Sequence, residues 1–218
     1  MSAARAAPSA VVFDIGGVFL DWDPRHLYRK LIADEAELER FLAEVCTPSW
    51  HAEQDLGVTI AASVASLAAA HPEHAALIRA WEERNEEMVA GVITGTVAIL
   101  DELEKAGVAC YACTNMEPEA YTRRLARYPF MSRFAGTVVS STEGCAKPDP
   151  ALLARLVARY RLEPRAALFV DDRPANLDGA ARLGFATHRF VSPELLRTDL
   201  VARGLLRATD ELTRGAGR

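Results

Sequence analysis

Short apolar runs alternate with amphipathic segments along most of this 218-residue sequence, and this alternation constrains the fold more than any other feature. The apolar runs occupy residues 10–16, 108–113, 136–140, 166–170 and 185–190. The segments with apolar residues at helical spacing lie at 96–106, 118–128, 150–160 and 174–183. Near-continuous apolar strands that alternate with helices are typical of a parallel sheet covered on both faces. The sequence therefore predicts an α/β fold.

Residues 22–89 interrupt this alternation, because they show helical patterns and no convincing strand. Helices are expected at 24–33, 35–45, 60–70 and 72–88. The alanine-rich stretch at 61–70 agrees with this interpretation, since alanine has the highest helix propensity. We therefore expect a core domain at 1–20 and 92–218 and an all-helical inserted domain at 21–91, with a hinge between Gly91 and Gly95.

The overall charge argues against nucleic-acid and membrane partners. The 25 Lys and Arg residues oppose 30 Asp and Glu residues, and no basic block stands out. No stretch approaches the roughly 18 consecutive apolar residues of a membrane span. Residues 1–9 lack the apolar stretch of a secretory signal, and no long heptad pattern indicates a protein partner. We expect a cytoplasmic protein with no obligate protein partner.

The four cysteines do not form a disulfide scaffold or a metal site in this interpretation. Cys110 and Cys113 match a C-x-x-C pattern, but they lie in an expected strand. Residues three apart on a strand point to opposite faces, so these two sulfurs cannot share a ligand. We expect both to be structural.

Polar side chains stand where the expected strands end, which is where open α/β sheets bind their ligands. The residues at or beyond these ends are Asp14, Thr114, Asn115, Lys147, Asp171 and Asp172. They lie far apart in the sequence, but the carboxyl ends of parallel strands meet at one edge of the sheet. We therefore expect one site at this edge.

The chemistry of this set points to phosphoryl transfer. Asp14 is a carboxylate that can attack phosphorus and form a covalent intermediate. Asp171 and Asp172 would repel Asp14 unless the three share a cation, and hard oxygen ligands favour Mg²⁺. The remaining candidates, which would bind the substrate phosphate and offset its charge, are Thr114, Asn115 and Lys147.

Four motifs follow one another along the chain: Phe13-Asp-Ile-Gly-Gly-Val-Phe, Cys113-Thr-Asn, Lys147-Pro-Asp-Pro and Phe169-Val-Asp-Asp-Arg-Pro-Ala-Asn. In type and order they resemble the motifs of the haloacid dehalogenase superfamily. The helical insertion is similar to the cap that this superfamily places between its first and second motifs. The resemblance implies a Rossmann-like core with helices on both faces of its sheet and a nucleophile at Asp14.

The resemblance also implies a set of ligands. The carbonyl of Gly16 and the carboxylate of Asp172 would join Asp14 around Mg²⁺, with Asp171 coordinating directly or through water. Thr114 and Lys147 carry over as phosphate-binding groups. Asn176 matches the polar residue that usually follows the acidic motif.

One position departs from the phosphatases of this superfamily, which usually carry a second Asp two residues after the nucleophile as general acid and base. Here that position is Gly16, which cannot move a proton. Three explanations stay open: a substrate with a better leaving group, a weak catalyst, or a substitute acid elsewhere. The candidate acids are Asp21, Asp23, His51, Glu53 and Asp55.

The function expected from the sequence is a Mg²⁺-dependent phosphatase that acts on a small phosphomonoester through an aspartyl-phosphate on Asp14. The subgroup that the chain most resembles includes sugar-1-phosphate phosphatases, so a sugar phosphate is one candidate substrate. One alternative is a 2-haloacid dehalogenase, whose members lack the second Asp and need no metal, although the pair at 171–172 argues against it. Another is a weakly active or non-catalytic protein of the same fold.

Overall fold

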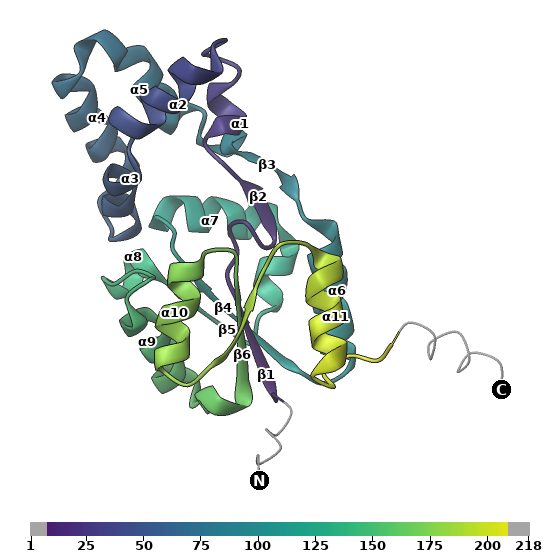
Figure 1. Cartoon of the computed structure of the whole chain (residues 1–218). Coiled ribbons are helices and arrows are strands. Elements are labelled where there is room, and N and C mark those ends of the chain that lie inside the picture. The colour runs from purple at the N-terminus through teal and green to yellow at the C-terminus, as the bar shows by residue number, and fades with distance from the viewer. Residues whose placement is uncertain (1–7, 209–218) are drawn as a thin grey trace.

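The computed structural model describes residues 8–208, and a five-stranded parallel sheet forms its centre (Figure 1). The spatial order of the strands is β5-β4-β1-β6-β7. Their bounds are β1 Ala10–Phe13, β4 Ala109–Thr114, β5 Gly136–Val139, β6 Ala167–Asp171 and β7 Ala186–Arg189. This arrangement confirms the predicted α/β fold, because each predicted apolar run contributes one strand.

Helices cover both faces of the sheet, as the sequence predicts. The main ones are α6 Thr94–Lys105, α7 Pro118–Arg127, α9 Pro150–Tyr160, α10 Pro174–Arg182 and α11 Pro193–Ala202. Short elements complete the core at η3 Pro129–Arg133, α8 Ser140–Glu143 and η4 Pro164–Ala166. Their positions agree with the predicted helices to within one or two residues for α6, α7, α9 and α10.

Alternate residues of each strand pack into two separate apolar cores. Val11 of β1 belongs to the core under α6 and α11, whereas its neighbour Val12 belongs to the core under α9 and α10. Cys110 and Cys113 divide in the same way, one to each core. The period of two therefore places the two sulfurs on opposite faces of the sheet, as predicted.

Proline in the first turn and a polar N-cap explain where several helices begin. The Glu117 carboxylate accepts hydrogen bonds from the first backbone N–H groups of α7, and Asp149 does the same for α9. Proline suits this position because a backbone N–H there would have no hydrogen-bond partner within the helix, so its absence costs nothing. These local signals are visible in the sequence, which is why these helix starts could be predicted.

An insertion of five short helices follows β1, between two small strands, β2 Leu20–Trp22 and β3 Val89–Val92. The helices are α1 Arg25–Tyr28, α2 Glu35–Glu44, α3 Pro48–Asp55, α4 Ile60–Ala70 and α5 Ala75–Glu83. Single 3-10 turns lie at η1 Pro72–His74 and η2 Asn85–Met88. Buried side chains from Leu27 to Met88 form a third apolar core within the insertion itself.

The structure differs from the sequence prediction at several places in this insertion. β2 and β3 pair with each other in antiparallel fashion, so the two ends of the insertion are strands and not helices. Gly91 lies in β3 and Gly95 in α6, where a hinge was expected. The expected helix at 24–33 is α1 alone, and the expected helix at 72–88 is divided into η1, α5 and η2. Strands of three or four residues are too short for a period-two signal to stand out.

α3 is a helix of the insertion that the sequence prediction missed. The Thr47 hydroxyl caps its N-terminus by accepting a hydrogen bond from Trp50 N, and Pro48 occupies its first turn. Thr followed by Pro is a recognisable start signal, so the local sequence did contain the information. The helix brings His51 and Asp55 to the side of the insertion that faces the sheet.

The arginine-rich sequence after Gly204 predicts a last helix and a frayed tail, but the last helix of the described residues is α11, which ends at Ala202 and was not predicted. The rest of the expected helix and tail, residues 209–218, lies outside the described residues, as does most of the N-terminal segment considered for a signal. Across residues 8–208, no helix combines the length and the apolar character needed to cross a bilayer.

Replacing Gly179 with Ala is expected to destabilise the protein by about 1–3 kcal/mol, the usual cost of overpacking. A Cβ atom at Gly179 in α10 would lie 2.5 Å from the carbonyl oxygen of Pro148. Glycine to alanine inside a helix normally stabilises by about 0.5–1 kcal/mol, so this contact reverses the sign. Urea denaturation measures the effect, and Asp178→Ala on the exposed face of α10 is the control. Equal or greater stability of the Gly179 variant would contradict this prediction.

Candidate active site

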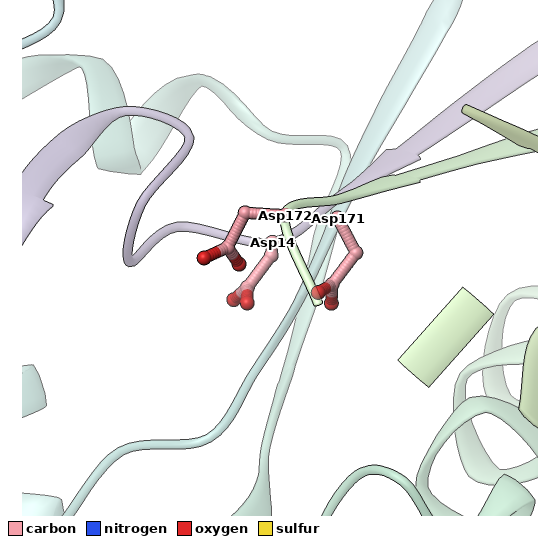
Figure 2. Close-up of side chains that lie close together, drawn as sticks. All are labelled: Asp14, Asp171 and Asp172. Carbon is pink, nitrogen blue, oxygen red and sulfur yellow. The ribbon is translucent and has the colours of Figure 1, made fainter. Parts of the chain in front are cut away.

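Three carboxylates meet at the carboxyl edge of the sheet. Asp14 directly follows β1, and Asp171 ends the neighbouring strand β6, with Asp172 next to it. The parallel register aligns Phe13 with Val170, so the two strands end at the same level. One oxygen from each carboxylate lies within 4.8 Å of the other two, and Figure 2 shows the three side by side.

A buried ammonium joins two of these carboxylates. Lys147 Nζ lies 2.7 Å from Asp14 Oδ2 and 2.8 Å from Asp171 Oδ2. Burial alone would lower the pKa of Lys147, but the attraction of these two carboxylates outweighs it and raises the pKa. Lys147 therefore stays positively charged at the sheet edge.

Asn115 holds the Lys147 backbone in place. Its side-chain Nδ2 donates to the Lys147 carbonyl oxygen, and its Oδ1 accepts from the Lys147 N–H, both at 2.9 Å. The amide thus links the end of β4 to the loop before α9. Asn115 was predicted to bind substrate, and the structure places its side chain on this loop at the wall of a cavity.

Asp171 is fully buried, and its two oxygens accept four hydrogen bonds. Oδ1 accepts from the Arg173 backbone N–H and Oδ2 from Lys147 Nζ. Asn176 Nδ2 lies 2.9 Å from Oδ1 and 3.0 Å from Oδ2. Asp172, in contrast, is partly exposed and lines the cavity. The two adjacent acids therefore have different surroundings. Asp171 is held by a hydrogen-bond network, whereas Asp172 faces the cavity.

Asp14 is buried in a group of side chains whose negative charges outnumber the positive charge of Lys147. The pKa of Asp14 is raised to about 7, because burial and the charges of Asp171 and Asp172 outweigh the opposing effect of Lys147. Burial and the charge of Asp171 also raise the pKa of Asp172. Three carboxylates share one Lys147 ammonium, so the group carries excess negative charge that a divalent cation would neutralise.

The local backbone leaves room for a cation. Gly17 has a φ of +71°, and a Cβ atom there would lie 2.8 Å from the Asp172 carboxylate, so only glycine fits beside that side chain. A Cβ atom on Gly16 would meet no atom within 4 Å. Carboxylate oxygens in this number and spacing match the ligands that Mg²⁺ takes, so the residues fit the expected ion.

The site edge opens into a cavity of about 690 Å³ between the sheet and the insertion. Asp14, Lys147 and Asp172 lie on the core side of this cavity. Of the site residues predicted from the sequence, Thr114 and Asp171 do not line this cavity. Thr114 is buried at the end of β4, and its hydroxyl lies 3.5 Å from the Asn115 carbonyl oxygen.

The insertion supplies the opposite wall, which combines aromatic and apolar side chains with polar ones. Trp22 stacks on His51 with ring centroids 5.0 Å apart, and Trp81 packs against the same imidazole. Burial lowers the pKa of His51 to about 4, so this ring is neutral near pH 7. No local sequence pattern places Trp22 of β2 or Arg124 of α7 at the cavity, because only the tertiary fold brings these elements there.

The five candidate acids occupy different environments. Asp21 is exposed and contacts His26 at 3.0 Å, and Glu53 is exposed on α3. Asp23 lines the cavity, but its carboxylate accepts from the Arg25 backbone N–H and guanidinium. The two that remain, His51 and Asp55, both line the cavity on α3.

Residues 8–184 match the model of the haloacid dehalogenase-like hydrolase family. The chain belongs to this family. The match covers the sheet through β6 and α10, including the insertion. This match confirms the resemblance that the four motifs indicated. The chain is therefore an enzyme of the hydrolase class.

Two curated proteins are similar in sequence to this hydrolase. Sesquiterpene phosphatase astK of Aspergillus oryzae is 25% identical over 187 residues, which are 80% of this chain and 86% of that protein. Acyl-CoA dehydrogenase family member 10 of Mus musculus is 39% identical over 70 residues. This second match covers 32% of the hydrolase but 6% of the mouse protein.

Solved structures share the fold at low sequence identity. A family enzyme from Bacteroides thetaiotaomicron in complex with magnesium has a TM-score of 0.67 at 17% identity, covering 85% of this chain and 94% of that one. The same enzyme has also been solved with magnesium and inorganic phosphate. L-2-haloacid dehalogenase from Xanthobacter autotrophicus has a TM-score of 0.58 at 18% identity, covering 89% and 83%.

Proposed function

We propose that this hydrolase is a Mg²⁺-dependent phosphatase that acts on a small phosphomonoester through an aspartyl-phosphate on Asp14. The observation that carries the proposal is the group of three carboxylates within 4.8 Å, with Lys147 Nζ 2.7 Å from Asp14 Oδ2. A dehalogenase that attacks carbon without a metal has no need of a second and third carboxylate beside its nucleophile. This excess charge favours phosphorus over carbon as the point of attack.

The first step uses Asp14 as the nucleophile. One of its oxygens forms a bond to phosphorus as the bond between phosphorus and the leaving-group oxygen breaks. Lys147 offsets the charge of the phosphate oxygens, and Asn115 keeps Lys147 in position. In the second step, water attacks the aspartyl-phosphate, which releases phosphate and restores the Asp14 carboxylate.

Asp14, Asp172 and the carbonyl of Gly16 would hold Mg²⁺, and Asp171 would act on the ion through water because its oxygens already accept four hydrogen bonds. When bound, the ion supplies positive charge that favours approach of the phosphate dianion and its transfer. The role of this chain is to hold the oxygens in place with Lys147 and Asn176.

The insertion would act as a cap, with residues 21–91 forming a unit over the core at 1–20 and 92–218. Its own apolar core supports this division, as does its position above the sheet edge in Figure 1. A cap in this place would exclude water and select the substrate. The magnesium and phosphate complexes of the Bacteroides enzyme and the phosphatase activity named for astK are consistent with the proposal.

Removing divalent metal is expected to reduce phosphate release by at least about 100-fold, because the ion contributes several kcal/mol to charge neutralisation. Phosphate release is measured over a panel of sugar 1-phosphates, other sugar phosphates, prenyl phosphates and aryl phosphates, with Mg²⁺ and with EDTA. Adding Mg²⁺ back should restore activity. Chloride release from 2-chloropropionate with no phosphate release from any ester would overturn the proposal and identify a dehalogenase.

A further inference from the structure

The position two residues after the nucleophile carries no proton donor, and the structure points to where one stands. Gly16 occupies the position two residues after Asp14, and glycine has no group that transfers a proton. A poor leaving group departs as an alkoxide unless an acid protonates it, and such help contributes about 10²–10⁴-fold to the rate. The inference below rests on the proposed function.

Asp55 is the acidic side chain of the insertion that is both buried and at the cavity wall. Its residue is 8% exposed, and it shares the cavity with Asp14, Lys147 and Asp172. Asp21 and Glu53 are exposed, and the Asp23 carboxylate already binds Arg25. His51 also lines the cavity, but it is unprotonated near pH 7 and carries no proton to donate as an imidazolium.

The position of α3 places Asp55 close to the sheet edge. Asp55 is the last residue of α3, and this helix packs against α4 within the insertion and against α8 of the core. Just beyond it, a Cβ atom at Gly57 would lie 3.4 Å from the backbone oxygen of Ser141. The end of α3 therefore lies against α8 of the core, and the two helices are neighbours in Figure 1.

The charged groups around Asp55 come mainly from the core. Lys147 and Arg173 act on its carboxylate, and so does the amide of Asn115. α4 contains no ionisable side chain. Glu143 of α8 forms an ion pair with Arg159 at 2.7 Å. The groups that act on the Asp55 carboxylate are therefore those beside the proposed phosphate site. Neither α4 nor α8 presents an unpaired acid that could share the Asp55 proton.

We infer that Asp55 is the catalytic acid, donating its proton to the leaving-group oxygen when Asp14 attacks phosphorus. The electron pair of the breaking bond goes to that oxygen, which takes the proton, and Asp55 is left as a carboxylate. In the second step the attacking water gives a proton back to Asp55 as its oxygen bonds to phosphorus. Each turnover therefore restores both aspartates.

The protonation state of Asp55 suits this task. Burial raises its pKa to about 6, although Lys147, Arg173 and Asn115 act in the opposite direction. The C-terminal end of α3 adds negative potential, which also favours the protonated carboxyl. An acid with a pKa near the working pH is the most effective donor.

Asp55→Asn is expected to slow hydrolysis of alkyl and sugar 6-phosphates by about 10²–10⁴-fold. Hydrolysis of p-nitrophenyl phosphate should change by less than about 5-fold, because its leaving group needs no acid. In the wild type, turnover of the alkyl esters should fall as pH rises above about 6, and the variant should lose this dependence. Glu53→Gln, an exposed acid on the same helix, is the control and should behave as wild type.

Adding an acid at the vacant position provides a second, independent test. The open space around Gly16 accommodates a side chain, so Gly16→Asp in the Asp55→Asn background should recover at least about 10-fold of the lost alkyl-ester activity. Recovery would also show that the Asp55 variant folds. The thermal unfolding midpoint of each variant is measured alongside.

The outcomes separate this inference from the proposed function. An equal loss for all leaving groups in Asp55→Asn, with no rescue by Gly16→Asp, would overturn the role of Asp55 and leave the phosphatase proposal standing. Wild-type protein that releases no phosphate from any ester would overturn both.

Discussion

Replacing Asp14 with Asn is expected to reduce phosphate release by at least about 10³-fold, since removal of a covalent nucleophile commonly costs that much or more. The amide nitrogen and oxygen of Asn are far weaker nucleophiles than a carboxylate. The variant also loses one of the three charges that favour Mg²⁺. Initial rates with the best ester of the panel measure the loss, and the phosphorylated intermediate, trapped in acid, should disappear with it.

The fold should survive this substitution, because Asn has nearly the same shape as Asp and Lys147 keeps its contact with Asp171. Asp23→Asn is the matched control, since Asp23 is another carboxylate at the cavity that is bound to Arg25. That control should retain a phosphorylated intermediate. Undiminished turnover in Asp14→Asn would show that another group attacks phosphorus and would sink the proposed mechanism.

Replacing Lys147 with Met is expected to lower the free energy of unfolding by about 3–5 kcal/mol, the typical cost of breaking a buried ion pair on one side. Lys147 is 5% exposed, and its ammonium bonds to both Asp14 and Asp171. Without it, two buried carboxylates face each other with no compensating charge. Methionine keeps the length and the apolar stem of the side chain, so the effect reports on charge more than on packing.

Urea denaturation of the metal-free protein measures this change. Lys105→Met is the control, because Lys105 lies exposed in the last turn of α6. The control should differ from wild type by less than about 0.5 kcal/mol, as surface substitutions usually do. A Lys147 variant as stable as the control would mean that the two carboxylates do not depend on its charge.

The core of the fold could be predicted because each of its strands is a continuous apolar run and several of its helices begin at Pro after a polar cap. The same logic located Asp14, Asp171 and Asp172, since a polar residue directly after a buried strand must lie at the sheet edge. Lys147 was found from its motif. These inferences used neighbours in the sequence only.

The insertion could not be predicted to the same extent. β2 and β3 pair across more than 60 intervening residues, and no local pattern specifies that pairing. The sequence offered five candidate acids without a way to rank them, because ranking needs the contact of α3 with α8. The hydrogen bonds of Asn115 with the Lys147 backbone are likewise a tertiary feature. Local sequence patterns determine where helices and strands form, but tertiary contacts determine which residues face the cavity.

The separate apolar core of the insertion has an evolutionary consequence. The helices between β2 and β3 form their own buried cluster, and the chain enters and leaves it through these two paired strands. Mutations around Trp81 thus need not disturb the packing beneath Asp14, whereas Trp22 packs against both cores. A lineage can accumulate new substrate preferences in one half of the cavity while purifying selection holds the other half constant. Retention of the fold at 17% identity is the outcome such a division permits.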